Sequence, residues 1–312
     1  MSELISGYQF IPLRDLDPMR ERLFAWASEL GLLGTVLIAP EGINFSLGGR
    51  AAALKVWLQR LEGDFAVADP VLHRQPVSRV PFLRLKVRVR PEIIAFDERL
   101  DPGQMPTGQA LDPEDWHQLL DRAEVQLVDA RNDYEYRIGS FRGAENPRIE
   151  RFSDFTRWAR THLDPERPVA MFCTGGVRCE KAGARLLADG FSQVYQLRGG
   201  ILAYLQCFAG QSSLWDGECF VFDDRVSVDK ELRPSERPVC AGCRHPHDDL
   251  PANGMPPVNP TGDCRLCGRH FDPAHLAGIS ERVRQIALAR ERGVTHLGPQ
   301  PSAGQSQEGS NA

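Results

Sequence analysis

The segment from Cys173 to Arg178 carries the strongest chemical signal in the sequence: a cysteine, a short loop with two glycines, and an arginine. It follows an apolar run at 169–172, which predicts a strand, and precedes a helical pattern at 179–187. Loop N–H groups and the positive end of a helix both stabilise a thiolate at the first position. We therefore predict that Cys173 is catalytic and that Arg178 closes the loop or holds an anion. The rest of the active-site loop is Thr174, Gly175, Gly176 and Val177.

The competing interpretation of Cys173 is a small buried apolar side chain, which is what most free cysteines are. Glycines able to adopt positive φ, and the arginine that ends the loop, favour the reactive thiol. Asp129 and Arg131 lie at the end of a predicted strand; they are either catalytic or, as we favour, a buried ion pair that supports the loop. Cys179 is either a resolving thiol or a packed neighbour.

Four further cysteines form two Cys-x-x-Cys knuckles, Cys240 with Cys243 and Cys264 with Cys267. This spacing is typical of a structural zinc ion held by four thiolates. The segment between the knuckles has few large apolar residues, so a metal would supply order that a small core cannot. We predict zinc here, with four reduced thiols or a redox pair as the alternative. Three histidines lie near enough in sequence to replace a thiolate: His245, His247 and His270.

Basic and apolar residues alternate strictly from residue 84 to residue 90. In a strand, this period of two puts the apolar side chains on one face and the cations on the other. The cations are Arg84, Lys86, Arg88 and Arg90. Four cations along one strand suit a phosphate backbone, so we predict RNA contact there. A charged edge strand that discourages aggregation would show the same pattern.

The strands and helices predicted around these residues indicate an α/β protein with several domains. Residues 1–93 alternate as β-α-β-β-α-β, the order of the ferredoxin-like fold, with the last strands at 65–72 and 82–90. Residues 94–111, rich in proline and glycine, predict a linker. In residues 112–215, strands at 125–129, 169–172 and 193–197 alternate with helical patterns, which predicts a parallel sheet. Ligands of such sheets bind at the carboxyl ends of the strands, where Cys173 lies.

The end of the chain differs in character from these two domains. Residues 216–275 form the Cys-knuckle region, and residues 276–312 predict a helix followed by a disordered tail. The sequence therefore predicts a small zinc-type region after the two α/β domains.

The 312 residues are 42% hydrophobic and 25% charged, as in a globular protein, and the length predicts two or three domains. The net charge of −5 means that any contact with RNA must be local. The sequence has no run apolar enough to span a membrane and no signal-peptide pattern at its start. We expect a cytoplasmic protein with no membrane or evident protein partner, whose cysteines serve catalysis and metal binding.

The middle domain resembles the rhodanese homology domain. Three regions carry the resemblance: 127–147 (LVDARNDYEYRIG, then FRGAENP), the loop at 173–178, and 194–201 (VYQLRGGI). The resemblance implies that Cys173 forms a persulfide and that residues 173–178 are the active-site loop. Phosphatases related to this fold have a loop one residue longer, so the loop here favours sulfur over a phosphoryl group.

The whole chain resembles the bacterial rhodanese-domain tRNA uridine hydroxylases. The matching segments are 39–44 (APEGIN), 129–135 (DARNDYE), 173–182 (CTGGVRCEKA) and 215–223 (WDGECFVFD). The resemblance implies an oxidoreductase that converts the wobble uridine of tRNA to 5-hydroxyuridine, with Cys173 as the catalytic residue and molecular oxygen as co-substrate. The sequence shows no flavin, haem or nucleotide signature.

Two other functions fit the same residues. A sulfurtransferase would pass persulfide sulfur from thiosulfate to an acceptor through Cys173. A non-catalytic RNA-binding protein would keep the loop without its chemistry, but the intact Cys173 and Arg178 argue against that interpretation.

Overall fold

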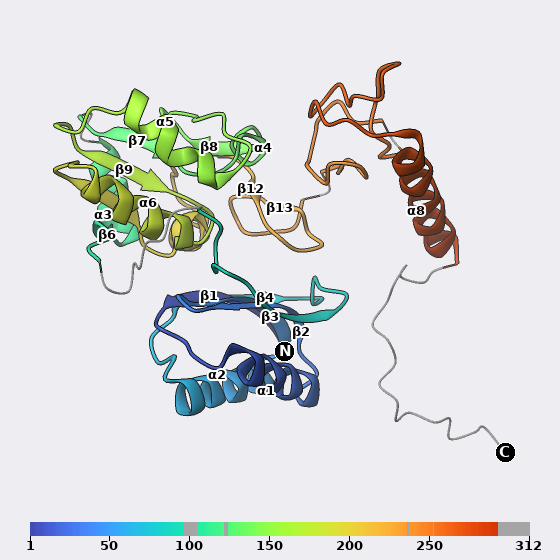
Figure 1. Cartoon of the computed structure of the whole chain (residues 1–312), viewed down its shortest axis with the longest axis horizontal. Helices are drawn as coiled ribbons and strands as arrows, with labels where there is room; N and C mark the ends of the chain where they lie inside the picture. Colours follow the sequence, from blue (N-terminus) through green and yellow to red (C-terminus); the bar gives the residue numbers. More distant parts are fainter. Residues whose placement is uncertain (97–104, 122–123, 236, 252, 293–312) are drawn as a thin grey trace. The chain divides into compact units, whose positions relative to one another are not determined.

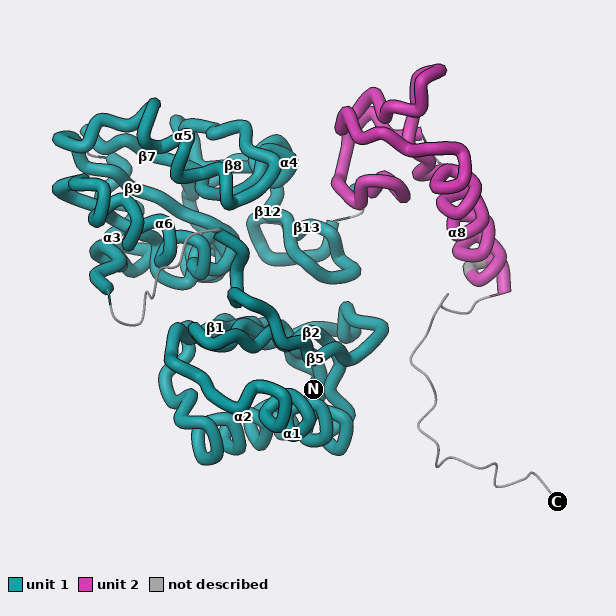
Figure 2. The backbone as a smooth tube through the Cα atoms, in the orientation of Figure 1, with its two compact units in different colours: residues 1–237 teal, residues 238–312 magenta. Residues whose placement is uncertain are grey.

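The computed structural model describes residues 1–96, 105–121, 124–235, 237–251 and 253–292. It divides into two compact units, residues 1–237 and 238–312 (Figure 2). The first unit contains two α/β domains, and the second contains both Cys-x-x-Cys knuckles and the helix α8 (Pro273–Glu291). Across the described ranges, we find no helix that is long and apolar enough to cross a membrane.

The N-terminal domain is a five-stranded sheet with both of its helices on one face (Figure 1). Its elements are β1 (Ser2–Phe10), α1 (Leu16–Glu29), β2 (Leu33–Ala39), β3 (Gly42–Arg50), α2 (Ala51–Phe65), β4 (Val71–Val77) and β5 (Leu85–Val89). The strand order is β4-β1-β3-β2-β5, in which the first four strands have the ferredoxin-like order and β5 is added in parallel to β2. The predicted ferredoxin-like fold is confirmed.

One predicted strand of this domain is displaced. The sequence predicts a strand at 65–72, but α2 continues to Phe65 and the strand β4 begins at Val71. Leu58, Leu61 and Phe65 keep helical spacing and pack against the same core, which extends the helix by a further turn.

Alternation along the strands gives the N-terminal sheet two different faces. On one face, Ile5, Val36 and Phe45 pack against Leu23 and Trp57 of the two helices. The other face is not covered by these helices, and its side chains line a cavity. They include Ser6, Tyr8, Thr35, Asn44, Ser46 and His73.

The second domain is a parallel sheet covered on both faces, as predicted for a rhodanese-like domain. Its strands are β6 (Gln109–Leu111), β7 (Gln126–Asp129), β9 (Val169–Phe172) and β10 (Val194–Leu197), in the order β6-β10-β9-β7. The helices α5 (Phe155–His162) and α6 (Val177–Ala188) pack on one face, and α3 (Pro113–Asp121) and α7 (Gly200–Cys207) on the other. Strand β6 lies in the segment predicted as a linker; three residues are too few for a pattern, and only pairing with β10 defines them.

Short elements complete the first unit. They are α4 (Asp133–Tyr136), β8 (Gly139–Phe141), the 3-10 turn η1 (Phe152–Asp154), β11 (Trp215–Gly217), β12 (Cys219–Phe220) and β13 (Ser227–Val228). Strand β11 pairs with β8, so residues 216–237, which the sequence analysis assigns to the Cys-knuckle region, lie in the first compact unit. The other predicted domain boundaries stay predictions.

A buried lysine joins the two domains of the first unit. Lys181 in α6 is 0% exposed, and its Nζ lies 2.9 Å from Oε1 of Glu41 and 2.6 Å from Oε1 of Glu92. One residue earlier, Glu180 Oε1 accepts a hydrogen bond of 2.7 Å from the hydroxyl of Tyr8. The first turns of α6, which begins at Val177 within the predicted active-site loop, therefore also hold the N-terminal domain.

Candidate active site

Cys173 directly follows β9, and the loop that it opens turns into α6 within four residues. The backbone N–H of Gly176 donates a hydrogen bond to Cys173 Sγ at 3.1 Å. Gly176 has a φ of 102°, and a Cβ at this position would lie 2.8 Å from the hydroxyl oxygen of Tyr8. Glycine is needed here both for the backbone conformation and for space.

The beginning of α7 supports the loop from behind. The N–H groups of Ile201 and Leu202 donate to the carbonyl oxygens of Cys173, at 2.9 Å, and Thr174, at 3.1 Å. Gly200 has a φ of 65°, and a Cβ there would lie 2.5 Å from the carbonyl oxygen of Cys173. The glycine pair in segment 194–201 thus permits close contact between α7 and the loop.

Opposing effects set the ionisation of Cys173. The side chain is 1% exposed, and its burial, which is the largest effect, raises the pKa. The hydrogen bond from the Cys179 thiol, the charge of Arg178 and the N–H groups of Arg178 and Cys179 outweigh burial and lower the pKa to about 6. Burial, followed by the interaction with Cys173, raises the pKa of Cys179, which therefore stays protonated as the donor. At neutral pH, Cys173 is mostly a thiolate.

Arg178 is bound to a carboxylate that the sequence analysis did not select. Its Nη1 lies 2.7 Å from Oε2 of Glu135 and its Nη2 lies 2.8 Å from Oε1, and both side chains are buried. The hydroxyl of Thr174 donates to the same carboxylate at 3.3 Å. Burial acts to raise the pKa of Glu135, but the charge and hydrogen bonds of Arg178 lower it below its usual value. A bidentate pair of this kind closes the loop in one geometry.

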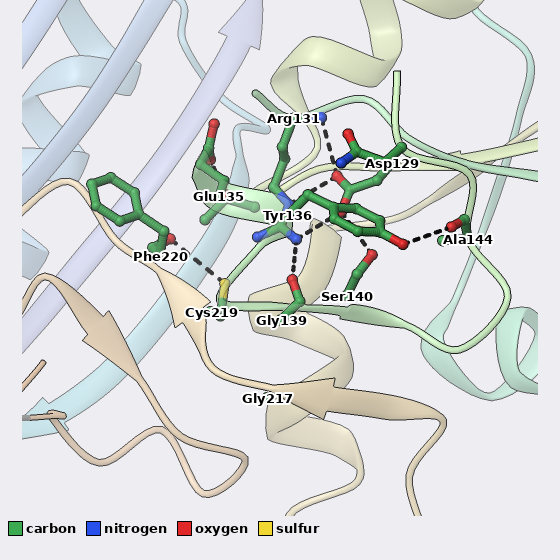
Figure 3. Close-up of polar contacts among 12 residues, drawn as sticks. Asp129, Arg131, Glu135, Tyr136, Gly139, Ser140, Ala144, Gly217, Cys219 and Phe220 are labelled. Atoms are coloured by element: carbon green, nitrogen blue, oxygen red, sulfur yellow. Dashed lines mark hydrogen bonds and ion pairs between the residues drawn. The ribbon is translucent and has the colours of Figure 1, made fainter. Parts of the chain in front are cut away.

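Asp129 and Arg131 form a second buried ion pair (Figure 3). Arg131 Nε donates to Asp129 Oδ1 at 2.9 Å, and Nη2 donates to Oδ2 at 2.7 Å. Arg131 Nη2 also donates to the carbonyl oxygen of Gly139 at 2.5 Å, and the hydroxyl of Ser140 donates to Asp129 at 2.8 Å. These bonds join the end of β7 to β8, so the pair holds the strand beside β9 in place.

Cys173 lines a cavity of ≈ 670 Å³ inside the first unit. The predicted loop residues Thr174, Gly175, Val177 and Arg178 also line it, together with the helix-free face of the N-terminal sheet. Pockets of roughly 300–1,000 Å³ are typical of sites for small molecules. The Cys173 side chain is therefore almost fully buried, but the residue belongs to the wall of a space that a small ligand can occupy.

Three side chains near this cavity were missed by the sequence analysis: Tyr8, His73 and Glu180. Burial mainly raises the pKa of Glu180, and the charge of Cys173 raises it further. Glu180 and Glu135 both lie in segments that carry the family resemblance, and this signal could have found them. Tyr8 and His73 lie on strands, and a strand pattern does not tell which face meets another domain.

The four cations of the basic segment lie along the edge of the N-terminal sheet. Their side chains are exposed, while Leu85, Val87 and Val89 pack against the core, as the alternation predicts. In the described ranges none of the four lines the Cys173 cavity. The four cations are Arg84, Lys86, Arg88 and Arg90.

The two Cys-x-x-Cys knuckles have matching backbone geometry. In the first knuckle, the N–H of Cys240 donates to the carbonyl oxygen of His245, and the N–H of Arg244 donates to the carbonyl oxygen of Cys240. In the second, the N–H of Cys264 donates to the carbonyl oxygen of Arg269, and the N–H of Gly268 donates to the carbonyl oxygen of Cys264. All four hydrogen bonds measure between 2.8 and 3.0 Å. Arg244 and Gly268 have φ of 67° and 70°. The two knuckles, whose Cys-x-x-Cys spacing is typical of zinc sites, therefore share one turn geometry.

Thiol and imidazole groups meet at these turns. The pKa of Cys243 is raised, first by burial and then by Cys240 and Cys267. The Cys243 sulfur and ring nitrogens of His245 and His247 lie within 4.8 Å of one another, with 3.4 Å between Cys243 Sγ and His247 Nε2. Sulfur and imidazole donors are those that zinc prefers, so the residues present fit such an ion.

Comparison with protein families agrees with the two domains of the first unit. Residues 2–93 match a family model described as UPF0176 acylphosphatase like domain, and residues 112–207 match the rhodanese-like domain. The fold and the cysteine loop thus define a rhodanese-type protein preceded by an acylphosphatase-like domain.

Relatives that match most of the chain define the family more closely. Proteins named tRNA uridine(34) hydroxylase from Synechococcus elongatus, Sinorhizobium fredii and Acaryochloris marina are 45%, 40% and 39% identical to it. The matches cover 78%, 93% and 96% of this chain and 91%, 93% and 97% of those proteins. The chain belongs to the tRNA uridine(34) hydroxylase family.

The ionisation of Cys173 can be measured by alkylation with iodoacetamide. Its rate should rise with pH through about 6, because only the thiolate reacts. Cys207 is an internal control, since burial and the nearby Glu114 raise its pKa to about 11. Peptide mass spectrometry across a pH series gives both rates from one sample. A Cys173 rate that rises only near 9, the ordinary thiol value, would contradict the assignment.

Proposed function

We propose that this protein hydroxylates uridine 34 of tRNA and that Cys173 is the residue that reacts. The observation that carries the proposal is the Cys173 thiolate in the wall of a cavity of ≈ 670 Å³, in a chain of this family. A base in an anticodon loop reaches such a buried sulfur only when it leaves its stack. The cavity supports this because it combines the reactive loop with an open sheet face.

Molecular oxygen is the proposed co-substrate. Replacing the hydrogen at C5 of uracil by a hydroxyl group uses one atom of O2. The other atom leaves as water after taking up two electrons and two protons, which two thiols supply when they form a disulfide. A dithiol in the assay therefore supplies the two electrons and two protons that the reaction needs.

The proposed activity is tested with purified protein, tRNA, a dithiol and isotopically labelled oxygen gas. Nucleoside mass spectrometry should show 5-hydroxyuridine carrying the label. We expect Cys173→Ser to lower the rate by about 10³-fold or more, as loss of a reacting nucleophile does. Cys207→Ser, which removes a thiol bonded to Glu114, should keep the rate. An undiminished rate for Cys173→Ser would remove the sulfur from the reaction.

The same assay distinguishes the other functions that fit the sequence. Release of thiocyanate from thiosulfate and cyanide, together with an unmodified uridine, would make the protein a sulfurtransferase. Label taken from water instead of oxygen gas would exclude O2 as the source. If no nucleoside of the tRNA changes and no thiocyanate is released, the remaining function is that of a non-catalytic RNA-binding protein.

We further propose that the cations on and beside β5 contact the phosphates of tRNA. Arg88→Glu should weaken tRNA binding about tenfold and lower the slope of log K against log salt by about 1. Lys55→Glu makes the same change of charge at an exposed position of α2 and should leave both values unchanged. Filter binding at several salt concentrations measures them. Equal effects of the two variants would show that only net charge matters.

Structural zinc is proposed for the second unit, held by Cys240, Cys243, Cys264 and Cys267. Elemental analysis should find about one zinc ion per chain, lost in Cys264→Ser and retained in Cys207→Ser. If Cys243, His245 and His247 hold the ion instead, Cys264→Ser keeps it and His247→Ala loses it. A wild-type protein free of zinc after purification without chelators would contradict both ligand sets.

A further inference from the structure

Phe222 is an exposed aromatic residue in the wall of the Cys173 cavity. It is 67% exposed and lies in the loop that joins β12 to β13 (Figure 1). Single exposed apolar side chains are common on proteins and need no explanation. Phe24 in α1, for example, is 49% exposed, but within the described ranges it is not part of the cavity wall. Phe222 is different because it is open to solvent and also belongs to the space that the reactive loop lines.

The loop that carries Phe222 is held in a fixed conformation. The N–H of Val221 donates to the carbonyl oxygen of Val226 at 2.8 Å, which closes the turn. Arg225 donates from Nη1 to Oε1 of Gln75 at 2.6 Å, and Gln75 belongs to β4 of the N-terminal domain. These bonds fix the position of Phe222 before a ligand binds, and a preordered contact loses little conformational entropy on binding.

Phe222 also packs against a second aromatic side chain. Its ring centroid lies 5.1 Å from that of Phe220, and the two planes meet at 84°, which is an edge-to-face contact. Phe220 is 8% exposed and has the same kind of contact with Tyr134, at 5.1 Å and 86°. Phe222 is therefore supported from inside the protein while most of it stays accessible. Accessible aromatic rings bind the bases of single-stranded RNA by stacking.

Arg151 adds a positive charge to the same cavity wall. Two other arginines of the wall have carboxylate partners, since Arg178 is bonded to Glu135 and Arg225 is bonded to Asp223 at 2.6 Å. Arg151 is exposed and precedes the turn η1, and no carboxylate among the described residues pairs with it. Its guanidinium group is therefore available to a phosphate, which it can bind through two hydrogen bonds.

The part of the wall that the N-terminal sheet supplies is polar but uncharged. Its polar side chains include Ser6, Thr35, Asn44, Ser46 and His73. Burial, followed by the charge of Arg225, lowers the pKa of His73 to about 4, so the imidazole is neutral at pH 7. An uncharged polar surface suits a base and a ribose, which leaves the positive charge of Arg151 for a phosphate.

We propose that Phe222 stacks on a base directly next to uridine 34 and that Arg151 binds a phosphate of the same strand. The inference rests on the proposed function, in which uridine 34 leaves its stack to reach Cys173. Cys173 is 1% exposed and Phe222 is 67% exposed, so the sulfur belongs to the closed part of the wall and the ring to the open part. A base that leaves its stack uncovers one face of its neighbour. An aromatic ring that covers this face stabilises the opened loop.

The test measures binding of a fluorescently labelled anticodon stem-loop RNA by anisotropy. Phe222→Ala should raise Kd about tenfold, a typical loss for one stacked base. Phe222→Leu keeps an apolar side chain without an aromatic face and should raise Kd by a similar factor, whereas Phe222→Trp should keep the wild-type value. Phe24→Ala removes an exposed ring outside the cavity and should also keep it.

The phosphate contact is tested by the salt dependence of the same binding. Arg151→Gln should lower the slope of log K against log salt by about 1, because one phosphate contact is lost. Arg167→Gln makes the same change at an exposed position outside the cavity wall and should leave the slope unchanged. An unchanged slope for Arg151→Gln, or an equal change in both variants, would exclude the contact.

RNAs that lack a single base show which base Phe222 covers. On an RNA without base 33, or on one without base 35, Phe222→Ala should raise Kd by less than about twofold, because the partner of the ring is gone. The assignment is overturned if the effect persists on both RNAs, if it disappears only without base 34, or if Phe222→Ala binds the intact RNA normally. Phe222→Trp binding as weakly as Phe222→Ala would show a structural role instead. Binding needs no turnover, so these effects in a protein that hydroxylates no tRNA would overturn the proposed function and leave the contact in place.

Discussion

The buried ammonium group of Lys181 is the interaction on which the candidate site depends. An unpaired ammonium group inside a protein costs several kcal/mol, so Lys181 is stable at 0% exposure only while its carboxylate partners are in place. Glu41 belongs to the turn between β2 and β3, and Glu92 follows β5, so both partners come from the N-terminal part of the unit. Docking of the two domains and burial of this charge therefore occur together. The cavity, which takes one wall from each domain, exists only in that docked state.

The cysteine loop lies next to Lys181 in sequence, and the charged groups that hold this loop are themselves paired with one another. Arg178 contributes positive charge toward Cys173, but Glu135 binds it at both ends of the guanidinium group. The largest effect that lowers the pKa of Cys173 is the hydrogen bond from the Cys179 thiol, followed by the charge of Arg178 and then by the backbone N–H groups of Arg178 and Cys179. Such donors do not need to move when a charge forms on the sulfur, which is how a preorganised site works. The structure gives Cys179 a contact with Cys173 and so a role in ionisation, whichever of the two predicted roles it also has.

Much of the fold was predictable because its signals are local. The apolar run before Cys173 and the helical spacing after it determine a strand, a loop and a helix within about twenty residues. The alternation at 84–90 likewise predicted an edge of exposed cations with an apolar inner face. The sequence analysis missed β6, which is defined by its pairing with β10, and it placed a strand where packing against the core continues α2. In both cases a tertiary contact, and not a local pattern, defines the element. The sequence analysis also missed Glu135, because a carboxylate in a short helix is unremarkable until its partner Arg178, from another helix, is known.

The sequence by itself predicted the catalytic cysteine loop and showed the two cysteine knuckles, since each pattern depends on residues a few positions apart. Only the tertiary structure could place Tyr8, His73 and Lys181, which lie far from Cys173 in sequence or point away from its loop. A period of two assigns side chains to two faces of a strand but does not say which face another domain covers. That choice follows from the docking of one domain on the other, because there a neutral histidine and a thiolate come to line one cavity.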